Sequence, residues 1–303
     1  MTDTRAALGV GMVGYAFMGR VHSQAWRSVG AFFDLPVTPV MAALSGRSGD
    51  RTAAAAASLG WAAVETDWKD LVARDDVQIV DICTPGDSHA EIAIAALEAG
   101  KHVICEKPLA NTVAEAEAMV AAAERAAARG VRSMVAFNYR RVPAVALARQ
   151  WVAEGRLGRL RHVRAQYLQD WIVDPQFPLV WRLQKDKAGS GALGDIGSHI
   201  VDTAQYITGQ SLTGVSAITE TFVKERPLAE ESAGLAADAS EGAGETGTVT
   251  VDDAALFLGR FSGGAVGSFE ATRFASGRKN AMRIEVNGEL GSLAFDFESM
   301  NEL

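Results

Sequence analysis

The stretch Ala7-Leu8-Gly9-Val10-Gly11-Met12-Val13-Gly14 decides the fold of this chain. It combines a short apolar strand with the spacing Gly-x-Gly-x-x-Gly, and the pattern after it predicts a helix over residues 17–29. This spacing on a strand-to-helix turn is typical of dinucleotide-binding proteins, in which the pyrophosphate lies at the helix N-terminus. We interpret Gly9 as the tight turn, Gly11 as the point of backbone approach and Gly14 as the helix-packing glycine. A purely structural glycine-rich turn is the alternative.

The first half of the chain alternates apolar runs with helical patterns. We predict strands near residues 7–13, 39–45, 78–83, 102–105 and 132–137, and helices near 17–29, 51–59, 87–99 and 113–129. Alternating strands and helices form parallel sheets that are covered on both faces. The sequence therefore predicts an α/β, doubly wound Rossmann domain over residues 1–137.

The second half is richer in strands than in helices. We predict helices near residues 143–154 and 195–208, and strands near 160–168, 213–223, 249–261, 265–272, 281–287 and 291–297. Close connections at Ser262-Gly263-Gly264 and Asn287-Gly288-Glu289 indicate hairpins. We expect an α+β domain over residues 138–303 with a large, mostly antiparallel open sheet.

Composition excludes several classes of protein. The 303 residues suit two domains, and a net charge of −8 argues against a nucleic-acid partner. No apolar run approaches the ~18 residues of a membrane span, and no signal-peptide core precedes the first strand. We therefore expect a cytoplasmic protein without a membrane partner.

Two further features concern the cysteines and one unusual segment. Cys83 and Cys105 follow apolar runs without metal-ligand spacing, so we expect reduced core residues and no metal site. Residues 227–248 are rich in Ala, Gly, Ser and acidic residues, which predicts a mobile excursion or an arm that orders against another subunit.

A lysine lies at the predicted end of a parallel strand, in Val103-Ile104-Cys105-Glu106-Lys107-Pro108. Open parallel sheets bind ligands beyond the carboxyl ends of their strands, so Lys107 is expected to face the ligand crevice. The alternative is a surface turn in which Lys107 is solvated and Pro108 ends the strand.

A carboxylate and an imidazole are predicted to share one face of the helix near 195–208. Residues i and i+4 lie on the same helix face, which pairs Asp195 with His199. Such a pair can hold, orient and deprotonate a hydroxyl. The alternative is an N-terminal Asp favoured by the helix dipole beside an ordinary histidine.

These features together resemble the glucose-fructose oxidoreductase, inositol dehydrogenase and rhizopine catabolism family. The resemblance also rests on Thr84-Pro85, Ser88-His89, Ala99-Gly100-Lys101-His102, Glu106 to Ala110, and Asn138-Tyr139-Arg140. It implies a nicotinamide-dependent dehydrogenase or reductase of sugars, cyclitols and related polyols. It also implies a C-terminal segment beyond Leu303, because members generally run longer than this chain.

The resemblance implies a catalytic set of Lys107, Asp195 and His199. Oxidising an alcohol requires a proton acceptor, and we assign His199 as general acid/base, Lys107 as electrostatic stabiliser and Asp195 as orienter of the hydroxyl. The cofactor-binding residues implied are Gly9, Gly11, Val13, Gly14, Phe17, Met18, Ser45, Arg47, Thr84, Pro85, His89, Glu106, Lys107 and Asn138. The substrate-binding residues implied are Lys107, Arg140, Gln169, Trp171, Trp181, Asp195 and His199.

Cofactor choice depends on the end of the second predicted strand. An NAD-selective site usually places an acid there, and none appears before Asp50. Arg47, with Ser45 or Ser48, is suited to a 2′-phosphate, which favours NADP within an NAD(P) assignment. Arg47 stacked over the adenine is the alternative.

Aromatic residues with polar neighbours indicate the substrate class. Tyr167-Leu168-Gln169-Asp170-Trp171 and Trp181-Arg182 suit stacking on a sugar ring and hydrogen bonds to its hydroxyls. Together with Gly-Ala-Leu-Gly-Asp at 191–195, they resemble the levoglucosan dehydrogenase branch of the family. Core or interface aromatics are the alternative.

The expected function is an NAD(P)-dependent oxidoreductase that acts on a secondary alcohol or ketone of a sugar, anhydrosugar or cyclitol. We expect a homodimer or homotetramer formed through the C-terminal sheet. A non-catalytic dinucleotide-binding redox sensor is the alternative, although it need not keep Lys107, Asp195 and His199 together. A hydrolase is disfavoured because no serine elbow or metal-ligand cluster is present.

Overall fold

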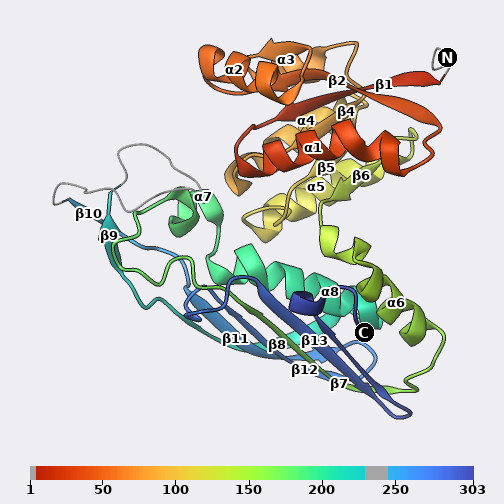
Figure 1. Cartoon of the computed structure of the whole chain (residues 1–303), viewed down its shortest axis with the longest axis vertical. Coiled ribbons are helices and arrows are strands. Elements are labelled where there is room, and N and C mark those ends of the chain that lie inside the picture. The colour runs from red at the N-terminus through yellow and green to blue at the C-terminus, as the bar shows by residue number, and fades with distance from the viewer. Residues whose placement is uncertain (1–4, 229–244) are drawn as a thin grey trace. The chain divides into compact units, whose positions relative to one another are not determined.

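The computed structural model describes residues 5–228 and 245–303 (Figure 1). The chain forms two compact units, Met1–Ala136 and Phe137–Leu303. The predicted excursion at 227–248 lies mostly outside the described residues. Among the described residues, no helix combines the length and apolar character that a membrane span requires.

The first unit contains a six-stranded sheet in the order β3-β2-β1-β4-β5-β6. Its strands are β1 (Ala6–Val13), β2 (Val37–Ser45), β3 (Ala63–Glu65), β4 (Ile79–Ile82), β5 (His102–Cys105) and β6 (Ser133–Val135). Every pairing in this sheet is parallel. The doubly wound prediction is confirmed, and the strand order changes direction between β1 and β4, where such sheets bind ligands.

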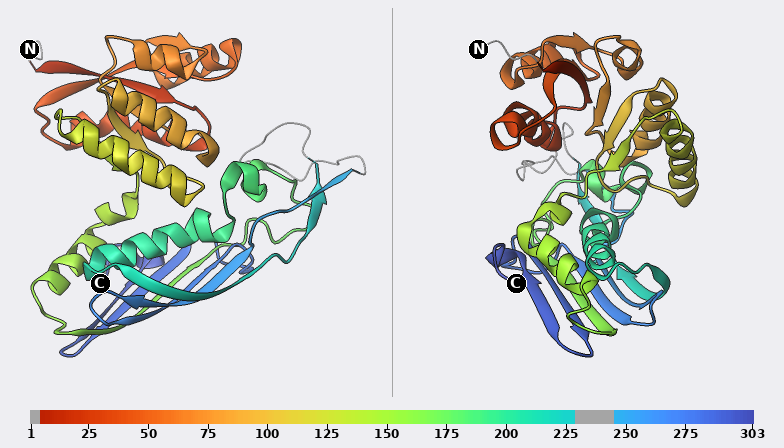
Figure 2. Two further views of the ribbon diagram at one scale, coloured as in Figure 1. Left: turned by 180° about the vertical axis from the view of Figure 1, so that it is seen from behind. Right: turned by 90° about the vertical axis from the view of Figure 1, so that its right-hand side faces the viewer.

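Helices cover both faces of this sheet (Figure 2). They are α1 (Phe17–Phe32), α2 (Gly49–Leu59), α3 (Trp68–Ala73), α4 (His89–Glu98) and α5 (Val113–Ala127). Successive residues of β1 point to opposite faces of the sheet and so supply two cores. Met12 packs with α1 and α2, and Val13 packs with α4 and α5. Thr112 and Glu115 form the capping box that begins α5.

The turn between β1 and α1 corrects our interpretation of the first glycines. Gly9 and Gly11 lie within β1 rather than at its end. A Cβ at Gly9 would lie 1.7 Å from the carbonyl oxygen of Asp76, and one at Gly11 would lie 2.7 Å from the side chain of Leu71. These two glycines therefore permit close packing of β1 against the neighbouring chain. The turn itself uses Gly14, with φ +96°, and the residues after it.

The second unit is built on a six-stranded sheet in the order β14-β13-β7-β12-β11-β8. Its strands are β7 (Leu160–Leu168), β8 (Leu212–Glu220), β11 (Ala254–Phe261), β12 (Val266–Thr272), β13 (Ala281–Gly288) and β14 (Ser292–Asp296). Within this sheet only β7 and β12 pair in parallel, so the mostly antiparallel prediction is confirmed. Two short strands, β9 (Glu225–Pro227) and β10 (Thr246–Thr248), form a separate pair.

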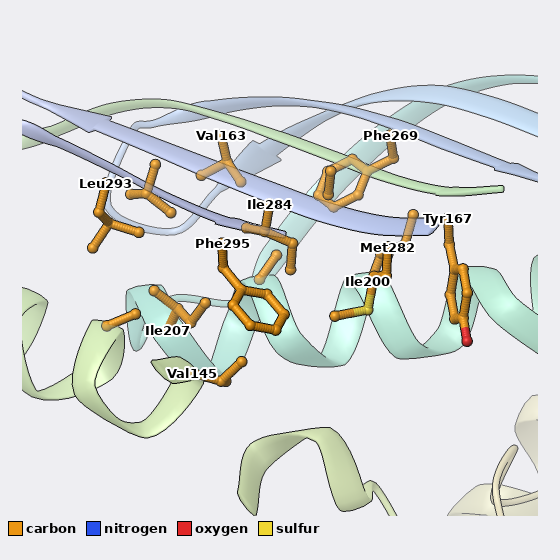
Figure 3. Packing of buried hydrophobic residues seen from close by; sticks show 14 of the residues in the cluster. Val145, Val163, Tyr167, Ile200, Ile207, Phe269, Met282, Ile284, Leu293 and Phe295 are labelled. Carbon is orange, nitrogen blue, oxygen red and sulfur yellow. The ribbon is translucent and has the colours of Figure 1, made fainter. Parts of the chain in front are cut away.

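Helices α6 (Pro143–Ala153) and α8 (Ser198–Thr208) lie against one face of this sheet (Figures 1 and 2). The core between these helices and the sheet contains Val145, Ile200, Ile207, Ile284 and Phe295, which point toward one another (Figure 3). The predicted helix near 195 begins differently from our expectation: Leu193–Gly197 is a π-helical turn that leads into α8. A short helix, α7 (Lys185–Ala188), precedes this turn.

Candidate functional site

The turn after β1 is shaped to accept an anionic group. A Cβ at Gly14 would lie 2.9 Å from the carbonyl oxygen of Cys83, and one at Gly19 would lie 2.3 Å from that of Gly14. Both positions therefore need glycine for the chain to turn this tightly. The N-cap of α1 is Ala16, whose side chain forms no capping hydrogen bond. The first turn of α1 can thus offer its N–H groups to a pyrophosphate.

The other predicted cofactor residues of the first unit differ in accessibility. Phe17 and Arg47 are exposed, and Met18, Thr84 and Pro85 are half-buried. Val13 and Ser45, at the ends of β1 and β2, are buried. Burial of Ser45 leaves Arg47 as the accessible member of the predicted pair at the end of β2.

His89 joins two of the loops at the carboxyl edge of the sheet. Its Nε2 lies 2.9 Å from the carbonyl oxygen of Thr84, and its Nδ1 lies 3.0 Å from that of Pro108. The ring is only 1% exposed. His89 is therefore placed to hold the loop after β4 to the loop after β5.

Lys107 follows β5 at this edge, as its sequence position predicts. The amide of Glu106 donates to the carbonyl oxygen of Ile82 on β4 at 2.9 Å, which extends the strand pairing by one residue. The amide of Lys107 then donates to Oε2 of Glu106 at 3.1 Å. Glu106 is buried, whereas Lys107 is half-buried.

In the second unit, Asp195 on the π-helical turn pairs with a buried arginine. Nη1 of Arg273 lies 3.6 Å from Oδ2 of Asp195, and the Arg273 side chain is fully buried. Burial lowers the pKa of Arg273, and the Asp195 carboxylate opposes that change. Because arginine stays protonated in proteins, Arg273 places a buried positive charge beside the Asp195 carboxyl group.

Asp252 holds the start of the same turn. Its carboxylate accepts hydrogen bonds from the amides of Gly191 and Leu193, both at 2.7 Å. Its carbonyl oxygen accepts from the amide of Ala192 at 2.9 Å and from Nη2 of Arg273 at 3.2 Å. A Cβ at Gly191 would lie 1.7 Å from that carbonyl oxygen, so only glycine fits.

His199 lies on α8 among aromatic rings. Its ring stacks on Tyr139 with centroids 4.4 Å apart and meets the edge of Phe137 at 6.0 Å. The residue is 7% exposed. The stacking fixes the plane of the imidazole. A group that transfers a proton needs such a fixed orientation toward its partner.

A line of hydrogen bonds runs through the predicted substrate residues of the second unit. The Trp171 indole N–H donates to Oε1 of Gln169 at 3.1 Å, and Nε2 of Gln169 donates to Oδ1 of Asn280 at 2.8 Å. The Tyr167 hydroxyl donates to the same oxygen at 2.6 Å and lies 2.6 Å from the Tyr139 hydroxyl. Burial raises the pKa of Tyr167 well above its usual range. Gln169 and Trp171 are thus connected through hydrogen bonds to Tyr139, whose ring stacks on His199.

Three other predicted residues lie apart from this line. The Arg140 guanidinium forms a two-point ion pair with the Asp202 carboxylate. The Trp181 ring carries the guanidinium of its neighbour Arg182, 4.2 Å from the ring centroid. Asn138 is exposed at the start of the second unit.

Sequence reasoning missed Arg273, Asp252 and Asn280. Arg273 and Asp252 lie more than 50 residues from the turn that they contact, Asn280 lies more than 100 residues from Gln169, and none belongs to a recognisable motif. A buried arginine leaves no local signal, because its role depends on the carboxylate that faces it.

Two family models match this chain. The oxidoreductase family with an NAD-binding Rossmann fold matches residues 8–137, and the GFO/IDH/MocA C-terminal domain matches residues 145–294. The chain belongs to the GFO/IDH/MocA family of oxidoreductases. The resemblance seen in the motifs is confirmed, as is the assignment to an oxidoreductase with a Rossmann domain for NAD.

Individual members of the GFO/IDH/MocA family are similar over nearly the whole chain. Levoglucosan dehydrogenase from Pseudarthrobacter phenanthrenivorans is 46% identical over 98% of this chain and 75% of its own length. The crystal structure of an oxidoreductase domain protein from Kribbella flavida is 67% identical with a TM-score of 0.91, covering 98% and 75% of the two chains. Levoglucosan dehydrogenase in complex with NADH and levoglucosan is 44% identical with a TM-score of 0.89, covering 97% and 74%.

Proposed function

We propose that this oxidoreductase transfers a hydride between a nicotinamide cofactor and a secondary alcohol or ketone of a sugar, an anhydrosugar or a cyclitol. One observation carries the proposal: Asp195, paired with a buried arginine, and His199, stacked on Tyr139, lie within a single turn and helix. Identity of 46% to levoglucosan dehydrogenase makes anhydrosugars the first substrates to test.

The chemistry assigns a separate role to each residue of the proposed catalytic set. The nicotinamide, when bound, accepts the hydride. His199 takes the hydroxyl proton, because its aromatic neighbours hold the ring in one plane. Asp195 accepts a hydrogen bond from the substrate hydroxyl, and Arg273 holds the carboxyl group from the buried side. Lys107 stabilises negative charge that develops on the alcohol oxygen.

The residues after β1 fit a dinucleotide. Gly14 and Gly19 leave space that a Cβ would fill, and the uncapped start of α1 suits a pyrophosphate. Among the residues expected to bind the cofactor, Phe17, Met18, Thr84, Pro85 and Asn138, which are exposed or half-buried, remain in the proposed set. Buried Val13, Ser45, His89 and Glu106 are proposed to support the loops rather than touch the cofactor.

A substrate panel tests the proposed function directly. Levoglucosan, other sugars and myo-inositol are each incubated with NAD or NADP, and the absorbance of the reduced cofactor is followed. We expect turnover with at least one anhydrosugar or cyclitol. Absence of turnover with every member of the panel, from a protein that binds the cofactor, would contradict the proposal.

Arg47 is proposed to favour NADP over NAD. Residues 41–49 contain no acid for the ribose 2′-hydroxyl, and Arg47 is exposed at the end of β2. The levoglucosan dehydrogenase complexes contain NADH, so NAD also belongs in every assay.

Replacing Arg47 by alanine should therefore lower affinity for NADP and leave affinity for NAD nearly unchanged. The physical reason is loss of a cationic partner for the 2′-phosphate. Quenching of tryptophan fluorescence measures both affinities, with Lys69→Ala in the same unit as a charge-matched control. Equal losses for both cofactors would favour stacking on the adenine instead.

The open face of the second sheet is proposed to join copies of this chain as a homodimer or homotetramer. No described helix covers this face, whereas α6 and α8 cover the other (Figure 1). Four large apolar side chains on β8, β11 and β12 are exposed and share this face by strand register: Ile218, Leu256, Leu258 and Val266. Exposed apolar surface of this kind marks interfaces.

Glutamate at Ile218 and Leu258 should reduce the oligomer mass measured by light scattering. These side chains are 74% and 64% exposed, so the change leaves the core intact while placing charge in the proposed interface. Leu290→Glu is the matched control, because Leu290 is 74% exposed in the hairpin after β13. An unchanged mass in the double variant would remove this face from consideration.

A further inference from the structure

A histidine of the first unit lies between two buried carboxylates. His22 belongs to α1, and its Nδ1 lies 3.0 Å from both carboxylate oxygens of Asp81 on β4. Its Nε2 lies 3.0 Å from Oε1 of Glu106, after β5. The side chains of Asp81 and Glu106 are 0% and 7% exposed, and that of His22 is 16% exposed. One ring thus connects a helix to the ends of two neighbouring strands.

This geometry requires both ring nitrogens to carry protons. A carboxylate oxygen only accepts hydrogen bonds, and a neutral imidazole has one N–H. Burial by itself lowers the pKa of His22, but hydrogen bonds with Asp81, Cys83 and Glu106 raise it well above its usual range. The Trp26 indole N–H also donates to Asp81, at 2.8 Å. The cluster therefore contains one positive and two negative charges.

A metal ion is a less suitable occupant of this cluster. Ligand atoms of His22, Asp81 and Cys83 lie within 4.8 Å of one another. A metal ion would need an unprotonated ring nitrogen and favour a thiolate, whereas burial raises the pKa of the Cys83 thiol to about 12. The N–H of Trp26 also points at the carboxylate that would have to bind the ion.

Glu106 extends the contact to Lys107. While Oε1 faces His22, Oε2 accepts the backbone N–H of Lys107 at 3.1 Å. The orientation of the Glu106 carboxylate is thus tied to the main chain of the lysine. If the imidazolium is removed, Glu106 loses the cation that faces its Oε1 and has reason to turn toward water.

We propose that His22 is a positioning residue for the reaction: its imidazolium fixes Glu106 and, through it, the main chain that carries Lys107. The inference rests on the proposed function through the role of Lys107. His22 itself touches neither substrate nor cofactor in this role. If His22 only balanced the charge of the two carboxylates, its removal would lower stability without a separate effect on kcat. Measuring both quantities therefore separates a positioning role from charge balance.

Three variants make this distinction. His22→Gln removes the cation and leaves two buried carboxylates. His22→Gln with Asp81→Asn restores the net charge of the cluster to −1 but leaves Glu106 without its imidazolium. Trp26→Phe is the matched control. Trp26 lies on the same helix as His22, and the change removes its hydrogen bond to Asp81 while keeping the contact between His22 and Glu106. Each is assayed for kcat, cofactor affinity, thermal stability and the NMR shift of the Lys107 amide.

The double variant should regain stability lost in His22→Gln, yet keep kcat lowered by about tenfold or more, because a displaced reacting group is costly. Its Lys107 amide signal should move, whereas Trp26→Phe keeps both the signal and kcat. Recovery of kcat together with stability would show that His22 only balances charge. An unmoved Lys107 signal would overturn this inference alone, whereas absence of turnover with every member of the substrate panel would contradict the proposed function.

Discussion

Alanine at Lys107 or at His199 should lower turnover by about 10²–10⁴-fold, the usual range for a positioned acid, base or charged group. The first change removes the ammonium that we propose stabilises charge on the alcohol oxygen, and the second removes the proposed proton acceptor. Nucleotide affinity should be largely retained, because the turn at Gly14 is unchanged. Steady-state kinetics on a substrate from the panel, with a separate cofactor titration, measure both effects.

The double variant of Lys107 and His199 tests whether the two residues act on the same oxygen. When two groups act as a unit, removing both lowers turnover by less than the product of the two single reductions. Lys69→Ala, on α3, is the control for removing a lysine from the first unit. Near-normal turnover in both single variants would exclude the proposed catalytic set, and strictly multiplicative losses would indicate independent roles.

Alanine at Gly19 should lower dinucleotide affinity by more than tenfold, or about 1.4 kcal/mol of binding free energy. The new Cβ would lie 2.3 Å from the carbonyl oxygen of Gly14, so the helix must move away from the turn proposed to receive the pyrophosphate. Isothermal titration with NAD and NADP measures the change. Both cofactors should lose affinity equally, because the pyrophosphate is common to them.

Alanine at Gly30 is the matched control for this variant. Gly30 lies in the same helix, and a Cβ there would meet nothing within 4 Å. Helix propensity alone makes both changes favourable by roughly 1 kcal/mol, so any difference in affinity comes from the contact with the turn. Equal affinities in the two variants would show that the close approach of α1 does not shape the site.

The glycine turn illustrates what sequence can and cannot predict. Two overlapping glycine patterns follow one another, Gly9 to Gly14 and Gly14 to Gly19, and the second has Ala16 at its middle position. The first matches the expected spacing, but β1 runs through Gly9 and Gly11 to Val13. The length of β1 decides which glycine pattern forms the turn. That length is set by pairing with β2 and β4, which the local sequence does not record.

Regular elements with strong apolar periodicity were predicted well, whereas some three-residue strands and the long-range contacts were not. The predicted strand at 160–168 is β7 as observed. Strands β3, β9 and β10 have three residues each and no periodicity to detect. Within the candidate site, Lys107, Asp195 and His199 come from motifs. Arg273, which pairs with Asp195, is distant in sequence and becomes visible only when the chain is folded.

The amide of Asn280 sets the direction of every proton in the line from Trp171 to Tyr139. Its Oδ1 accepts from both Gln169 and Tyr167, so the Tyr167 oxygen must in turn accept from the Tyr139 hydroxyl. Gln169 can donate to Asn280 because its own oxygen already accepts from Trp171. These residues therefore form one polarised unit with a single terminal acceptor. Replacing Gln169 alone would leave the Trp171 N–H and the Asn280 oxygen each short of a partner, so a change at position 169 has to be compensated at positions 171 and 280.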